Sequence, residues 1–378
     1  MRAIKPIFIC LLPLLLLGCK TLAQRSTTGV IVARRAQIRS STAVVAADLL
    51  QVNRGDQVAI FDSTDVADPN DNTKKERWLR VKAHDEEATE GWIESRNVMP
   101  EDVLEASKKL AAEDGSVPAQ AAGQLRASSN LRLSPDRSGN ENIMMRLDSG
   151  SSFDIVGWKR VPKPKSSEAI ESDIAPKAGS AQQGNSRAGK QNDEEQAPEE
   201  TNEVWYKVRL PSSISPAPGG WIYGKQVELA VPSDIIFYRT GREFVAWQRL
   251  DGEPRDSNTS ATPKDAAREV KPGSWLILEK SSSSQPHTID EPDFDRIYVL
   301  GYDKRGQEHY TAYRSPDLKG YLPAKVEGHG DNKTFTLRLQ EESGSPVKDV
   351  QYGIYKDARG ILKVSTPNAP PAKEKRRR

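Results

Sequence analysis

Short runs of alternating apolar and polar residues, separated by polar turns, recur along most of the 378-residue chain. Val58-Ala59-Ile60 and Trp78-Leu79-Arg80-Val81 are two such runs, rich in β-formers and bounded by Gly, Asp and Ser, which is typical of strands. One segment differs. From Met99 to Asp114 the residues Val103, Leu104 and Leu110 recur at helical spacing, which predicts a helix. The pattern as a whole predicts a mainly β protein with one connecting helix.

Two windows of the chain share one order of motifs. The first contains Gln37-Ile38-Arg39, Trp78-Leu79-Arg80-Val81 and Gly91-Trp92-Ile93, and the second contains Asn130-Leu131-Arg132, Trp205-Tyr206-Lys207-Val208 and Gly220-Trp221-Ile222. This agreement indicates an internal repeat. Each copy offers about five short strands, too few to bury two faces as a flat sheet, so a small barrel is the expected solution.

The series of motifs resembles the bacterial Src-homology-3 family, an SH3-like barrel of extracytoplasmic proteins. The resemblance covers about residues 28–100 and 123–231, with 101–122 as a helical and polar linker. The glycine of the family's usual turn is missing from both copies, Arg39-Ser40-Ser41-Thr42 and Arg132-Leu133-Ser134-Pro135. The resemblance implies binding of peptidoglycan or of a protein in the cell envelope, but the missing glycine argues against a ligand contact at this turn.

The second copy carries a polar insertion. Residues 163–203 contain no Phe, Tyr or Trp, and hold nine acidic and five basic residues among many small polar ones. Such a composition cannot bury enough apolar surface to order itself, so we expect a disordered loop. The first copy has a shorter polar segment, Asp62 to Arg77, which we interpret as the same loop.

The last unit, residues 235–366, has eight candidate strands separated by turn signals such as Pro272-Gly273. An antiparallel β-sandwich or barrel is expected, and this unit resembles no family known to us. Residues 251–271 look like another polar loop, and 367–378 like a disordered basic tail. The candidate strands are Glu243–Leu250, Ser274–Lys280, Asp295–Tyr302, Glu308–Tyr313, Gly320–Val326, Lys333–Gln340, Tyr352–Tyr355 and Ile361–Val364.

The N-terminus has the form of a signal peptide, residues 1–18: two basic residues precede an apolar run too short to span a bilayer. Leu16-Leu17-Gly18-Cys19 resembles the bacterial lipobox. The resemblance implies cleavage between Gly18 and Cys19, a diacylglyceryl thioether on Cys19 and an acyl chain on its new amino group. Three chains exceed what stable anchoring requires. Lys20, in place of an acidic residue, predicts sorting to the outer membrane if the organism has one.

The composition excludes several kinds of structural and catalytic site. Both cysteines, Cys10 and Cys19, lie in the first 19 residues, so the body has no disulfide, zinc-thiolate site or catalytic thiol. The four histidines are all more than ten residues apart, and no nucleophile motif or cofactor signature is found. Without the signal peptide the acidic and basic residues balance, which argues against nucleic-acid binding. The acidic cluster Asp290, Glu291, Asp293 and Asp295 lacks the glycine turn of a calcium loop, so we expect a solvated loop.

The repeated tryptophans Trp78, Trp92, Trp205 and Trp221 are expected to build the barrel cores or line a groove. Trp158, which the first copy lacks, is the better candidate for an exposed contact, and Trp205, Trp221 and Tyr223 are weaker binding candidates. We therefore predict a lipid-anchored, non-enzymatic binding protein of the envelope. Two alternatives remain open: a wall-targeted enzyme with its activity in residues 235–366, and a structural component of an envelope complex.

Overall fold

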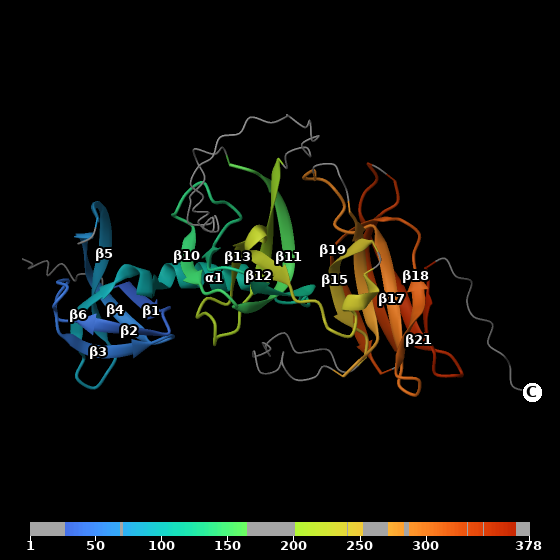
Figure 1. The fold of residues 1–378 in the computed structure, drawn as a ribbon, viewed down its shortest axis with the longest axis horizontal. Coiled ribbons are helices and arrows are strands. Elements are labelled where there is room, and N and C mark those ends of the chain that lie inside the picture. The colour runs from blue at the N-terminus through green and yellow to red at the C-terminus, as the bar shows by residue number, and fades with distance from the viewer. Residues whose placement is uncertain are drawn as a thin grey trace, which may run out of the picture.

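The fold was analysed in a computed structural model that describes residues 27–68, 71–164, 201–239, 241–251, 271–282, 287–330, 332–342 and 344–367. The signal peptide, the lipobox and most of the predicted insertion, polar loop and basic tail therefore lie outside the described residues. Three β units follow one another along the long axis of the molecule (Figure 1). We call them the first half-barrel (residues 27–100), the second half-barrel (residues 121–229) and the sandwich (residues 242–365).

The first half-barrel is one curled antiparallel sheet of seven strands in the order β3-β2-β6-β5-β4-β1-β7 (Figure 1). Its strands are β1 (Thr27–Ile31), β2 (Arg35–Arg39), β3 (Asp48–Asn53), β4 (Gln57–Asp68), β5 (Asp71–Ala83), β6 (Glu90–Glu94) and β7 (Val98–Pro100), with the 3-10 helix η1 (Ser95–Asn97) before β7.

The second half-barrel repeats this arrangement. Its order, β10-β9-β13-β12-β11-β8-β14, matches the first strand by strand, so the repeat seen in the sequence is confirmed. The expected five strands per copy was an undercount, because short strands at the start and end of each copy also join the sheet. The strands are β8 (Ala121–Leu125), β9 (Ser129–Arg132), β10 (Ile143–Leu147), β11 (Ser152–Pro162), β12 (Asn202–Arg209), β13 (Gly219–Tyr223) and β14 (Val227–Leu229), with the 3-10 helix η3 (Gly224–Gln226) before β14.

Close packing explains the shared motifs. Ile38 and Leu131 occupy equivalent places and are fully buried. A Cβ on Gly220 would lie 2.5 Å from Met144 Cε, and one on Gly91 would lie 2.5 Å from the backbone oxygen of Arg39. Only glycine fits at either position, which is why the closing strand reads Gly-Trp-Ile in both copies.

The arginine that ends each Gln/Asn-apolar-Arg motif fastens the loop that follows it. Arg39 Nη2 donates to the carbonyl oxygens of Val44 at 2.8 Å and Ala46 at 3.1 Å. Arg132, fully buried, donates to the carbonyl oxygen of Gly139 at 2.8 Å and to Asn142 Oδ1 at 2.6 Å. The turn that lacks the family's glycine is thus held by a side chain.

The predicted helix is confirmed as α1 (Glu101–Glu113), which joins the half-barrels (Figure 1). Val103 and Leu104 pack against a core formed mainly by the second half-barrel, with Val30, Val32 and Met99 from the first. The fully buried Ser107 hydroxyl donates to the carbonyl oxygen of Gly219 at 2.6 Å. The helix is therefore docked on the second half-barrel. Neither α1 nor any other helix in the described residues has the length and apolar character needed to cross a bilayer.

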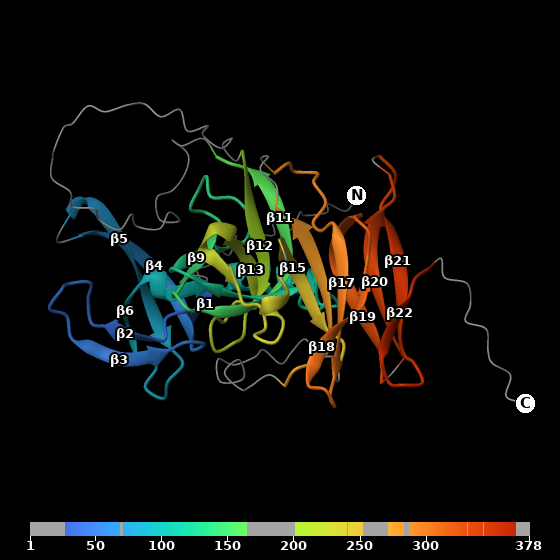
Figure 2. The same ribbon diagram turned by 45° about the vertical axis from the view of Figure 1, so that its right-hand side comes forward.

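The sandwich consists of two antiparallel sheets of four strands, β15-β16-β17-β18 and β19-β20-β21-β22 (Figure 2). All eight predicted strands are present, and a 3-10 helix, η4 (Ile236–Tyr238), precedes them. The strands are β15 (Arg242–Arg249), β16 (Trp275–Ser281), β17 (Arg296–Asp303), β18 (Glu308–Arg314), β19 (Lys319–His329), β20 (Asn332–Gln340), β21 (Lys348–Lys356) and β22 (Leu362–Ser365).

Strands β15, β16 and β17 are buried on both faces of their sheet. Along β16, Trp275 and Ile277 join the core of the second half-barrel, whereas Leu276 and Leu278 join the core shared with the other sheet. This explains the uninterrupted apolar run in that strand. The sheet β15–β18 therefore lies between the second half-barrel and the sheet β19–β22, and it packs against both (Figure 2).

One loop prediction was wrong, and one loop boundary needs correction. The polar segment 62–77 of the first half-barrel is part of a long hairpin, because β4 and β5 continue pairing as far as Asp68 and Asp71. The predicted insertion 163–203 ends earlier than expected, because strand β12 already begins at Asn202. The next residue, Glu203, is 3% exposed and forms a bidentate ion pair with Arg137.

Candidate functional site

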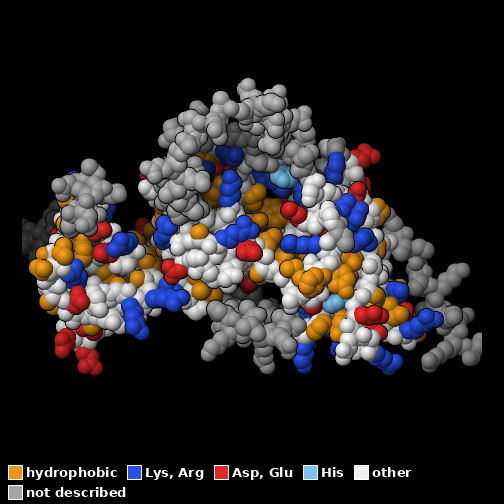
Figure 3. Space-filling view, in the orientation of Figure 1, with side chains coloured by type: hydrophobic (Ala, Val, Ile, Leu, Met, Phe, Trp, Pro, Cys, Tyr) orange, Lys and Arg blue, Asp and Glu red, His pale blue; other side chains and the backbone are white. Residues whose placement is uncertain are grey.

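A cleft of about 220 Å³ lies between the second half-barrel and the sandwich. Figure 3 shows hydrophobic side chains in a hollow at this junction, with Lys and Arg side chains around it. One wall comes from the hairpin β11–β12, whose residues Trp158 and Arg160 pair directly with Tyr206 and Val204. The other wall comes from the start of β15 and the end of β16, with Glu243, Phe244 and Lys280 among its residues.

Strand alternation places these side chains on the outer face of the hairpin. Trp205, between Val204 and Tyr206, points the opposite way and is fully buried inside the half-barrel. Tyr206 therefore faces the cleft, where its ring meets that of Trp158 edge-on, with centroids 6.0 Å apart. Trp158 is partly buried and also packs against the core of the sandwich.

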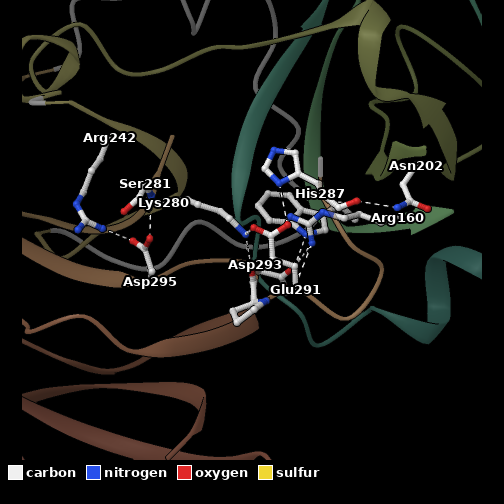
Figure 4. Close-up of polar contacts among 11 residues, drawn as sticks. Arg160, Asn202, Arg242, Lys280, Ser281, His287, Glu291, Asp293 and Asp295 are labelled. Atoms are coloured by element: carbon white, nitrogen blue, oxygen red, sulfur yellow. Dashed lines mark hydrogen bonds and ion pairs between the residues drawn. The ribbon is translucent and has the colours of Figure 1, made fainter. Parts of the chain in front are cut away.

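The segment 287–295 closes the cleft on one side, and its acidic residues are engaged in contacts (Figure 4). Asp293 accepts from Trp158 Nε1 at 2.5 Å and from the backbone N–H of Leu322 at 2.9 Å, and it lies 3.5 Å from Arg160 Nη1. One carboxylate thus binds both the second half-barrel and strand β19 of the sandwich.

Two further acids fix the segment to the sandwich. Glu291 contacts Lys280 Nζ at 2.7 Å and His287 Nδ1 at 2.8 Å, and Asp295 pairs with Arg242 and accepts from the backbone N–H of Ser281 at 2.9 Å (Figure 4). Burial alone would raise the pKa of Glu291, but the hydrogen bonds from Lys280 and His287 outweigh it and lower the pKa.

The acidic cluster is therefore not the solvated loop that we expected from the sequence. Only Asp290 among its four acids is exposed. The other three are held by partners: Glu291 by Lys280 and His287, Asp295 by Arg242, and Asp293 by Trp158, which lies 135 residues away in the chain. No three His, Cys, Asp or Glu side chains within the described residues are placed to hold a metal ion.

The four aromatic residues predicted as binding candidates lie in three different places. Trp158 lines the cleft, and Trp205 and Tyr223 lie inside the second half-barrel with ring centroids 5.5 Å apart. Trp221 is partly exposed on the outer face, and Lys207 Nζ lies 6.0 Å from its ring centroid. In the first copy Trp78 is buried and Trp92 is partly exposed, in the same positions as Trp205 and Trp221.

Sequence reasoning missed Glu243, Tyr206 and Lys280 as cleft residues. Tyr206 could have been predicted, because it follows the repeated Trp205 and strand alternation places it on the opposite, outer face. Nothing in the sequence marks Glu243 and Lys280 as cleft residues. They are charged residues on strands, and they line a cleft only because the sandwich packs against the second half-barrel.

Comparison with known proteins does not assign the chain to a family. No family model and no curated protein matches the sequence. Two solved structures align along most of both chains. NlpC2 from Trichomonas vaginalis does so at 9% identity and a TM-score of 0.15, covering 92% of this chain and 95% of its own. NlpC1 from the same organism does so at 9% identity and a TM-score of 0.14, covering 92% and 90%. Scores this low do not establish a shared fold.

Proposed function

We propose that this protein is a lipid-anchored, non-enzymatic binding protein of the bacterial cell envelope, and that it holds peptidoglycan or an envelope protein in the cleft. The observation that carries the proposal is the cleft itself, which combines an aromatic pair, Trp158 and Tyr206, with the exposed carboxylate of Glu243. Concave sites with aromatic walls and a few convergent polar groups are typical of ligand binding. The lipobox-like Cys19 and the motifs that resemble bacterial SH3 domains support the location.

Sedimentation with purified cell wall tests the binding. We expect the chain to pellet with the wall, and Glu243→Ala to weaken pelleting without changing the melting temperature, because Glu243 is exposed and forms no ion pair with another described residue. Glu327→Ala is the matched control, since Glu327 is an exposed strand glutamate of the sandwich outside the cleft. Release of soluble wall fragments by the wild-type protein would contradict a non-enzymatic role.

A second experiment tests the anchor. Cys19 is the only cysteine that remains after the proposed cleavage, so Cys19→Ala should leave an uncleaved or soluble protein. Recovery of this variant in the membrane fraction at the normal processed size would contradict lipid anchoring. In a cell with two membranes, Lys20 predicts that the wild-type protein co-fractionates with outer-membrane markers on a sucrose gradient.

A further inference from the structure

The positive charges that line the cleft are already paired. Arg160 Nη1 donates to the carbonyl oxygen of Glu291 at 3.2 Å and lies 3.5 Å from Asp293 Oδ1. Lys280 Nζ contacts Glu291 Oε1 and the carbonyl oxygen of Pro292, and His287 contacts Glu291. An anionic ligand would have to break these contacts, and those of Arg160 also hold the second half-barrel against the sandwich.

Glu243 is in the opposite situation. Its backbone pairs with that of Lys280 across β15 and β16, but the Lys280 ammonium is drawn to Glu291 instead. The side chain of Glu243 has neither a hydrogen bond nor an ion pair with the described residues, and Glu243 is exposed on the cleft wall. The cleft therefore presents one carboxylate with its charge unpaired by that part of the chain.

Tyr206 and Glu243 line the same cleft. Burial raises the pKa of Tyr206, the negative charge of Glu243 raises it further, and the positive charge of Arg160 acts in the opposite direction. Within the described part of the chain the Tyr206 hydroxyl has no hydrogen-bond partner. A donor placed at Glu243 would thus find a second oxygen nearby.

The rest of the cleft is suited to an apolar stem that carries a cation. The rings of Trp158 and Tyr206 and the side chain of Val204 line it. A cation held beside aromatic rings gains additional electrostatic attraction. A volume of about 220 Å³ is many times that needed for one water molecule and accommodates a short aliphatic chain.

We infer that the cleft selects a primary amine on a short apolar stem, with the ammonium at Glu243 and the Tyr206 hydroxyl, and the stem against Trp158. This inference rests on the proposed binding function and names the chemical class of the ligand group. A peptide side chain ending in an ammonium has this form.

Saturation-transfer NMR with the chain from Lys20 onward, which contains every described residue, tests the inference. The probes are Nα-acetyl-lysine amide and the same molecule acetylated at Nε. We expect the free amine to bind at least about tenfold more tightly than the acetylated form, and Glu243→Gln to abolish this difference. Glu327→Gln should leave it unchanged. Equal binding of the two probes, or no binding of either, would overturn the inference.

Sedimentation with cell wall whose amines have been acetylated distinguishes the amine inference from the proposed wall binding. If acetylated and native wall pellet the protein equally, and Glu243→Gln has no effect, the amine inference fails while wall binding stands. If native wall pellets none of the protein but the lysine probe binds and depends on Glu243, the amine inference stands and the proposed wall ligand is wrong.

Discussion

Trp158 joins the two sides of the cleft through a single hydrogen bond, so its indole N–H can be tested separately from its ring. Trp158→Phe keeps most of the packing against Tyr206 and removes the donor to Asp293. Bonds to charged groups contribute about 1.5–3 kcal/mol, and partial exposure reduces this, so we expect a loss of ~1–2 kcal/mol in urea unfolding.

Trp221→Phe is the matched control, because Trp221 is also partly exposed on a strand of the same half-barrel but has no indole hydrogen bond to the described residues. It should change stability by less than about 0.5 kcal/mol. Equal losses in the two variants would show that the bond to Asp293 contributes nothing.

Glu279 is a buried carboxyl that we expect to destabilise the fold at neutral pH. It is 1% exposed, and neither of its oxygens has a hydrogen-bond partner among the described residues. Burial raises its pKa above the ordinary 4.5, although Arg314, Arg296 and Arg242 pull in the opposite direction. Because the raised pKa belongs to the folded state, stability is gained below pH 4.5 and lost as the pH rises through the folded-state pKa.

Glu279→Gln removes this titration. We expect the variant to be more stable than wild type by about 1 kcal/mol at pH 7, with the difference shrinking as the pH falls through the folded-state pKa and levelling off below 4.5. Urea unfolding of both proteins at a series of pH values measures it. A variant that is less stable at pH 7 would mean that the three arginines, not burial, dominate at this site.

At the scale of elements, alternation in the sequence was a reliable guide wherever one face of a strand is buried. All eight strands of the sandwich were predicted from it, even though no family resemblance was available for that unit. The hairpin over 62–77 was missed because its strands are polar on both faces. Charged cross-strand pairs such as Asp65 with Arg77, at 3.2 Å, accompany its backbone pairing, and no apolar periodicity marks them.

The candidate site was less predictable than the fold. Trp158 was identified because it breaks the repeat, but its partner Asp293 and the cleft carboxylate of Glu243 come from another unit. Pairings across more than a hundred residues depend on how the half-barrel docks on the sandwich, which no local pattern records.

The glycines Gly91 and Gly220, at equivalent positions of β6 and β13, allow two degrees of steric clash to be compared. Gly91→Ala would place a Cβ against the backbone oxygen of Arg39, which cannot move aside, and Gly220→Ala would meet the flexible end of Met144. Both should lower stability by about 1–3 kcal/mol, with Gly91→Ala the larger loss. Gly157→Ala is the control, because no other group lies within 4 Å of the position that its new methyl group would take, and thermal unfolding should show no loss.

The insertion should be dispensable for folding. Lys163 N–H donates to the carbonyl oxygen of Thr201 at 3.0 Å, so a short Gly-Ser turn can replace residues 165–200. The cost of loop closure grows only as about (3/2)RT ln n, so the shorter chain should be equally or slightly more stable. A fall of more than about 10 °C in melting temperature, roughly 2 kcal/mol or more, would show that the insertion contributes to the fold.

At the scale of the whole molecule, the second half-barrel and the sandwich share more of their core with each other than with the first half-barrel. The interior of the first half-barrel is a cluster that includes Ile38 and Val81. The core between the second half-barrel and the sheet β15–β18 includes three residues of the first half-barrel, Val30, Val32 and Met99. Gln120, fully buried, adds a polar connection: its side chain exchanges two hydrogen bonds with the backbone of Ala324, at 2.7 and 3.0 Å.

We therefore expect two cooperative units, which hydrogen exchange read by mass spectrometry can distinguish. Val81→Ala removes apolar volume from the first core at a cost of about 2 kcal/mol, and should accelerate exchange ~30-fold in residues 27–100 only. Gln120→Ala leaves the backbone N–H of Ala324 without its partner, at about 1–3 kcal/mol, whereas the Ala324 carbonyl oxygen keeps its bond from Gln248 at 2.9 Å. The variant should accelerate exchange in the second half-barrel and the sandwich together. If Gln120→Ala affected the second half-barrel but left the sandwich unchanged, the shared sheet would not couple them, and the cleft between them would be an interface that opens without unfolding.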